Sequence, residues 1–115
     1  MSPLEDRIMS IAHMLDNAPE FDRTEVLVWQ VLVRSIDRLR FNHSGRLITK
    51  GLSQEEIIQR APTTVAPLTR KQIKHALERL RRLGYIEVHE RSASREIRFQ
   101  IHLQHSRSVV SRPIE

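Results

Sequence analysis

The feature that most constrains the fold of this chain is a basic amphipathic helix that leads, through one glycine, into two alternating strands. Within residues 69–83, apolar side chains recur at helical spacing, at Ile73, Ala76, Leu77, Leu80 and Leu83. This period predicts a helix with one face on a core. Thr69 suits the N-cap, Gln72 completes a capping box, and Gly84 fits the left-handed position that follows many helices. The sequence therefore predicts a helix with both ends marked.

The opposite face of this predicted helix is mainly cationic. With the apolar stripe toward the core, the side chains that point outward or flank the outer face are Lys71, Lys74, His75, Glu78, Arg79 and Arg82. Cations at this density suit the grooves of duplex DNA, which are lined with phosphates. A surface helix that is merely solvated is the alternative, and the helix alone does not decide between the two.

Two strands are predicted after the glycine. Apolar residues alternate with polar ones at Ile86 and Val88, and again over residues 97–103. Period two predicts strands that each have one face on the core and one in water. The tip between them, residues 91–95, contains no glycine, so we expect a loop of about four residues. Its arginines and serines suit contact with phosphates and the minor groove, and an ordinary surface turn is the alternative.

Further elements are expected before this region. One helix lies within residues 1–20, and a second begins with a capping box at Asp22 and runs to about Arg40. The second helix is apolar nearly all round, so it must be covered on several sides, either as the central helix of the core or at a dimer seam. A third, short helix begins with the capping box of Ser53 and stops before Pro62, and Leu47-Ile-Thr is expected to form a third strand beside the hairpin.

Residues 22–103 resemble the winged helix-turn-helix superfamily, as seen in small bacterial and phage regulators and in the N-terminal domains of phage replication proteins. The matching motifs are Leu52-Ser-Gln-Glu-Glu-Ile-Ile for the second helix, Thr69-Arg-Lys-Gln-Ile-Lys-His-Ala-Leu-Glu-Arg-Leu for the recognition helix, and Leu83-Gly-Tyr-Ile-Glu-Val for the entry to the wing. The chain departs from the family between the two helices, where seven residues with two prolines replace a tight turn.

The resemblance implies an α+β, mainly α fold. It consists of an extra N-terminal helix in residues 1–20, a winged-helix domain in residues 21–104 with a short three-stranded antiparallel sheet, and a flexible C-terminal tail in residues 105–115. The implied function is sequence-specific binding of double-stranded DNA by a transcriptional regulator. Helix 70–83 would enter the major groove, and the wing, residues 91–95, would contact the backbone or minor groove.

The candidate DNA-binding residues are Ser53, Gln54, Thr69, Arg70, Lys71, Lys74, His75, Arg79, Arg82, Arg91, Ser92, Ser94 and Arg95. The alternative function is a winged-helix module for protein interaction or replication initiation within a larger complex, because a fold does not settle a function. Binding to duplex DNA that weakens with salt would separate the two.

Charge is unevenly distributed along the chain. Residues 1–37 carry 3 basic and 7 acidic side chains, a net charge of −4, whereas residues 38–115 carry 16 and 7, a net charge of +9, which together give the +5 of the whole chain. The acidic N-terminal part and the basic C-terminal part suggest separate roles in self-association and polyanion binding. A lone helix of about 15 residues is marginal in water, so the apolar face of the first helix must pack on something. We expect it to form a homodimer; folding back on its own domain is the alternative.

Other classes of function find little support in the sequence. The chain has no cysteine, no Gly-rich phosphate loop and no His-Glu-x-x-His motif, so we expect neither an enzyme nor a cofactor. His102 and His105 would face opposite sides of a strand, so we expect no metal site either. No apolar run reaches about 18 residues and no signal peptide is evident, which predicts a cytoplasmic protein without a membrane partner.

Overall fold

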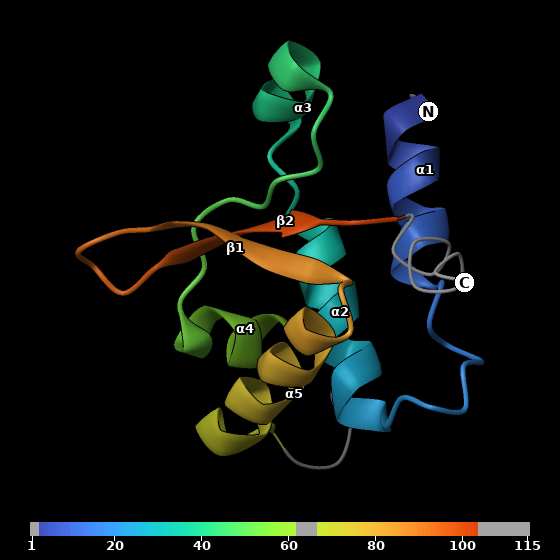
Figure 1. The fold of residues 1–115 in the computed structure, drawn as a ribbon, viewed down its shortest axis with the longest axis vertical. Coiled ribbons are helices and arrows are strands. Elements are labelled where there is room, and N and C mark those ends of the chain that lie inside the picture. The colour runs from blue at the N-terminus through green and yellow to red at the C-terminus, as the bar shows by residue number, and fades with distance from the viewer. Residues whose placement is uncertain (1–2, 62–66, 104–115) are drawn as a thin grey trace, which may run out of the picture.

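The structure is a computed structural model that describes residues 3–61 and 67–103 (Figure 1). Its elements are α1 (Pro3–Ala12), α2 (Arg23–Arg34), α3 (Arg38–Ser44), α4 (Gln54–Arg60), α5 (Arg70–Arg82), β1 (Ile86–Arg91) and β2 (Ile97–Ile101). The described fold is therefore α+β and mainly helical, with a two-stranded antiparallel sheet. Most of the link between α4 and α5, and the whole of the predicted tail 105–115, lie outside the described residues.

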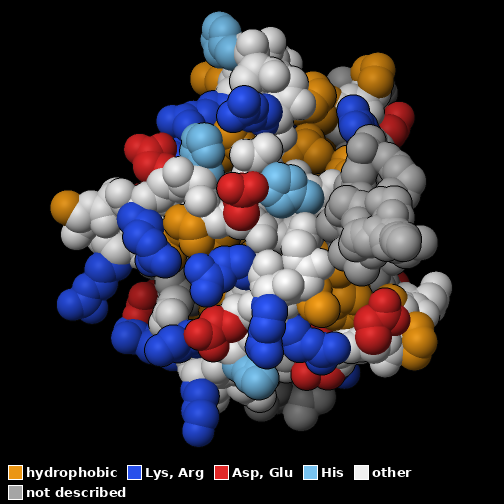
Figure 2. All heavy atoms as spheres, in the orientation of Figure 1, with side chains coloured by type: hydrophobic (Ala, Val, Ile, Leu, Met, Phe, Trp, Pro, Cys, Tyr) orange, Lys and Arg blue, Asp and Glu red, His pale blue; other side chains and the backbone are white. Residues whose placement is uncertain are grey.

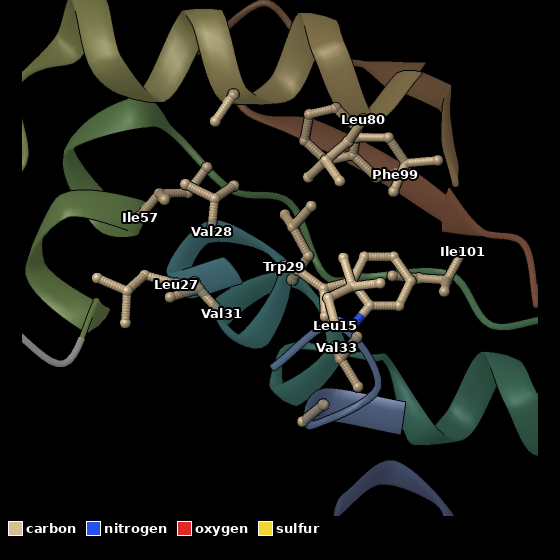
Figure 3. Packing of buried hydrophobic residues seen from close by; sticks show 14 of the residues in the cluster. Leu15, Leu27, Val28, Trp29, Val31, Val33, Ile57, Leu80, Phe99 and Ile101 are labelled. Carbon is tan, nitrogen blue, oxygen red and sulfur yellow. The ribbon is translucent and has the colours of Figure 1, made fainter. Parts of the chain in front are cut away.

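Helix α2 forms the centre of the core, as its apolar surface predicts. Val28, Trp29 and Leu32 have no exposed surface, and α1, α4 and α5 all pack on this helix. Figure 3 shows the cluster from close by, with Leu80 of α5 and Phe99 of β2 directed toward the side chains of α2. The hairpin and α5 are thus fixed to the same core, which sets their relative positions.

The second helix is shorter than predicted, because it ends at Arg34 rather than near Arg40. Beyond its end, the Asp37 backbone N–H donates to the Ile48 carbonyl at 2.7 Å, and the Asp37 carboxylate caps α3. Asp37 therefore begins a new helix. Helical periodicity does not predict this break, because the bond to Ile48 depends on a segment that comes later in the chain.

The sheet has two strands rather than the three that the sequence predicts. Strands β1 and β2 pair antiparallel, whereas residues 47–52 meet β2 through isolated bridges. A physical reason lies at Thr49, whose hydroxyl accepts the Phe99 N–H at 3.0 Å. A side-chain oxygen here takes the place of a backbone carbonyl and interrupts the ladder.

Helix α1 folds back on its own chain. Ile8 and Ile11 are buried against α2, and the Trp29 indole N–H donates to the Ile11 carbonyl at 2.8 Å. At the other end of α1, Glu5 pairs with Arg38 of α3, and the hydrogen bond from Arg38 lowers the pKa of the Glu5 carboxyl. This packing is the fold-back alternative, so the apolar face of α1 no longer argues for a homodimer. Homodimerisation stays a prediction, which light scattering can test.

Candidate nucleic-acid interface

Helix α5 has the local structure that its sequence predicts. Thr69 and Gln72 form the capping box, with the Gln72 N–H donating to the Thr69 hydroxyl at 3.1 Å and the Thr69 N–H to the Gln72 side chain at 2.8 Å. Gly84 follows the helix with a left-handed φ of 87°. Burial of Ile73, Ala76 and Leu80 then turns the opposite, cationic face outward.

A groove lies between the start of α4, helix α5 and the hairpin. It has a volume of about 340 Å³, and six of the candidate residues line it, namely Ser53, Gln54, Arg70, Arg91, Ser92 and Arg95. An adjoining hollow of about 200 Å³ shares Gln54 and Arg91 and is also lined by Lys74. We call the two hollows together the basic groove. It brings together cationic side chains from α5 and the hairpin, beside the first residue of α4.

Arg81 belongs to the basic groove, although it is not among the residues predicted from the sequence. It lines the adjoining hollow together with Lys74. The two residues are seven positions apart, which places them on the same side of a helix two turns apart. This spacing was a usable signal, because the side of α5 that carries Lys74 necessarily carries Arg81.

Other candidate residues lie away from the groove. Thr69, Lys71 and His75 line a separate hollow of about 330 Å³ that also involves Asp22 and Glu25, at the start of α2. Lys71 and His75 therefore lie on the side of α5 that faces the start of α2 and are not part of the basic groove. Arg82 is exposed near the end of α5, and the Ser94 hydroxyl lies 2.8 Å from that of Ser92.

Arg79 is engaged inside the protein. Its guanidinium lies 3.2 Å from the carboxylate of Glu25 and donates a hydrogen bond to the Glu20 carbonyl at 2.8 Å. The guanidinium carbon also lies over the Phe21 ring, 5.8 Å from the ring centroid. The side chain of Glu25 is only 3% exposed. Arg79 thus joins α5 to the beginning of α2, and these contacts leave it poorly placed to meet a nucleic acid.

Two further candidates also have partners within the chain. Arg70 pairs with Glu55, which ties the start of α5 to the start of α4. The Ser53 hydroxyl accepts the Glu56 N–H at 3.2 Å as part of the capping box of α4. A phosphate would have to compete with these contacts, so Arg70 and Ser53 offer less to a ligand than their positions suggest.

The remaining cations carry the positive surface. Among residues 3–61 and 67–103, no ion pair involves Lys71, Lys74, Arg81, Arg82, Arg91 or Arg95. Figure 2 shows Lys and Arg side chains gathered over α5 and the hairpin, with a few acidic side chains among them. This unpaired positive charge can attract a polyanion at long range and contact its phosphates directly.

The hairpin tip is a loop, as predicted, and one of its arginines has a strained backbone. The Ser92 N–H donates to the Glu96 carbonyl at 2.9 Å, which closes the loop. Arg95, inside it, has a φ of 70°. This left-handed conformation costs about 1 kcal/mol for a residue with a side chain, and glycine is the usual residue at such a position in a hairpin.

Replacing Arg95 with glycine should therefore raise the stability of the protein by up to about 1 kcal/mol, because glycine adopts this conformation without the steric cost. The same change should weaken binding to a polyanion, since it removes a cation from the basic groove. Urea unfolding and a binding titration on the same samples would measure both effects. Arg95→Lys keeps both the charge and the strained backbone, so it should change each quantity little. A glycine variant that is less stable than the wild type would contradict this account of the turn.

Membrane spans and metal sites are two further possibilities that the described residues do not support. In this part of the chain, no helix is long and apolar enough to cross a membrane. Nor does it contain a group of three or more His, Cys, Asp or Glu side chains arranged to hold a metal ion.

In comparisons with known proteins, no protein-family model, no curated protein and no solved structure matches the chain.

Proposed function

We propose that this chain is a winged helix-turn-helix protein that binds double-stranded DNA in a sequence-specific manner and acts as a transcriptional regulator. The observation that carries the proposal is the basic groove. Lys74 and Arg81 from α5 and Arg91 and Arg95 from the hairpin line it, and none of them has an acidic partner among the described residues. A surface that aligns unpaired cations from separate elements along a concave path suits the phosphates of a duplex.

In this proposal the outer face of α5 enters the major groove. Lys71, Lys74 and Arg82 are exposed along that face, and the hairpin tip, residues 91–95, reaches the adjacent backbone or minor groove. A homodimer, in which two such surfaces meet successive half-sites, is part of the proposal. The homodimer is supported by the charge distribution of the sequence, in which residues 1–37 are acidic and residues 38–115 are basic.

One observation favours the alternative, a module that binds another protein. The basic groove has an apolar floor that includes Leu77, Val88 and Ile97, all of them half-buried. Phosphates gain nothing from apolar surface, whereas an amphipathic peptide with acidic residues would use both the floor and the cationic rim. Binding to duplex DNA distinguishes the two functions, because a site built for such a peptide needs no affinity for a duplex.

Binding should be measured with labelled duplexes of genomic DNA at several salt concentrations. We expect the affinity to fall steeply with salt, and the double variant Lys74→Ala/Arg81→Ala to weaken binding to all sequences. The slope of log affinity against log salt should decrease by up to about 0.9 for each phosphate that the variant no longer neutralises. Thermal stability should change little, because both side chains are exposed and unpaired.

The matched control is Arg7→Ala/Arg46→Ala. It removes the same charge from exposed positions on α1 and after α3, and neither residue lines the basic groove. We expect this control to retain nearly all of the affinity. If the wild-type protein binds no duplex at low salt, the DNA-binding proposal is wrong and the protein-interaction module takes its place.

A further inference from the structure

One carboxylate interrupts the cationic surface of α5. Glu78 is the only acidic residue in this helix, it is exposed, and it lines the basic groove beside Lys74 and Arg81. None of the ion pairs found in residues 3–61 and 67–103 includes it. Its charge therefore stays among the cations of α5, while Glu55 and Glu96 are the other carboxylates that line the basic groove.

A carboxylate in this position works against non-specific binding. The affinity of a protein for any duplex comes mainly from cations that contact phosphates, so an unpaired negative charge beside them repels the ligand. Specificity, in contrast, comes from contacts with the edges of bases. A residue that lowers the affinity for all sequences can raise the preference for one of them if it makes a favourable contact with that sequence alone.

We propose that Glu78 is a specificity-determining residue that accepts a hydrogen bond from the N4 amino group of a cytosine in the major groove. This inference rests on the proposed function. An ionised carboxylate can only accept hydrogen bonds, and in the major groove the amino groups of cytosine and adenine are donors. In adenine the N7 acceptor lies beside the amino group and would repel the second carboxylate oxygen. Cytosine therefore suits Glu78 better.

The test is a selection of bound duplexes from a random library, carried out with the full chain and with Glu78→Gln. The wild-type protein should select a motif in which one C·G pair is strongly preferred. The glutamine variant should lose roughly 5- to 150-fold of that preference, the range of one good base contact. Because glutamine can bind adenine through both N6 and N7, the preferred pair should move toward A·T, while the rest of the motif stays the same.

A second readout is the affinity for a duplex of unrelated sequence. Glu78→Gln should raise it by up to about fivefold, because one exposed repulsive charge is removed. Asp6→Asn is the control: it removes the same charge from an exposed position on α1, far from α5 (Figure 1), and should alter neither the motif nor the affinity.

Each outcome distinguishes this inference from the function on which it rests. If the wild-type protein selects a motif and Glu78→Gln selects the same one, Glu78 does not read a base, although the protein still binds DNA. A wild-type selection without any preferred base overturns the inference as well. If the wild-type protein binds no duplex at all, the proposed function fails before any variant is compared.

Discussion

Replacing Arg79 with alanine should destabilise the folded protein by about 3 kcal/mol, the largest loss we expect from any single cation of α5. Removing one partner of a fully buried ion pair costs about 3–5 kcal/mol, because the other charge is left without compensation. The lower end applies here, since the side chain of Glu25 is 3% exposed but that of Arg79 is 36% exposed. The variant also loses the hydrogen bond to the Glu20 carbonyl and the stacking over Phe21.

The measurement is urea unfolding, followed by the fluorescence of the single tryptophan. Arg82→Ala is the matched control, because Arg82 is exposed three residues further along α5 and should change stability by no more than about 0.5 kcal/mol. Adding Glu25→Gln to Arg79→Ala should restore part of the loss, since it removes the buried charge that Arg79 compensates. If Arg79→Ala kept the wild-type stability but bound duplex DNA weakly, Arg79 would be a contact residue after all.

Arg79 illustrates which parts of the candidate site could be predicted from the sequence. Periodicity predicted correctly that Ile73, Ala76 and Leu80 face the core, because this depends only on the helix itself, whereas Leu83, predicted on the same face, is exposed. It could not predict that one flank of the helix faces α2 and the other the hairpin. That assignment depends on the packing of three elements, and it turns Arg79 inward while Arg81 joins Lys74 in the groove.

The fold shows the same division between local and distant causes. The capping boxes at Asp22, Ser53 and Thr69 were all predicted, because each involves residues only three positions apart. The break after α2 and the incomplete third strand were not. Both depend on hydrogen bonds between distant segments, one from Asp37 to Ile48 and one from Phe99 to the Thr49 hydroxyl.

The order of α1, α2, α4, α5 and the hairpin could be predicted because caps, glycines and periodicities mark the ends of most of these elements, but α3 was not predicted as a separate helix. The shape of the groove could not be predicted, because its walls come from parts of the chain up to 47 residues apart, from Leu52 to Phe99. The sequence does contain the chemical types of the groove, cations on a helix and at a hairpin tip. Their alignment along one concave path depends on the shared core, which fixes the positions of α4, α5 and the hairpin relative to one another.

Replacing Trp29 with alanine should have the largest effect on stability of any change considered, about 3–5 kcal/mol. The side chain is completely buried, its indole N–H donates to the Ile11 carbonyl at 2.8 Å, and its ring meets Tyr85 edge to face at 5.7 Å. It therefore joins α2 both to the end of α1 and to the residue that leads into the hairpin. The alanine variant would lack these interactions and leave a cavity between the three elements.

Circular dichroism should follow the unfolding, because the variants lack the fluorescent residue. A domain of this size is stable by only about 5–15 kcal/mol, so the alanine variant can be partly unfolded even without urea. Trp29→Phe keeps an aromatic ring but lacks the indole N–H, and it should lose about 1–3 kcal/mol. In Trp29→Phe, the rate of amide hydrogen exchange should increase more in α1 than in α5, relative to the wild type. The reason is that the hydrogen bond that this variant lacks connects α2 to α1 and not to α5. A phenylalanine variant as stable as the wild type, with unchanged exchange in α1, would show that Trp29 does not anchor this helix.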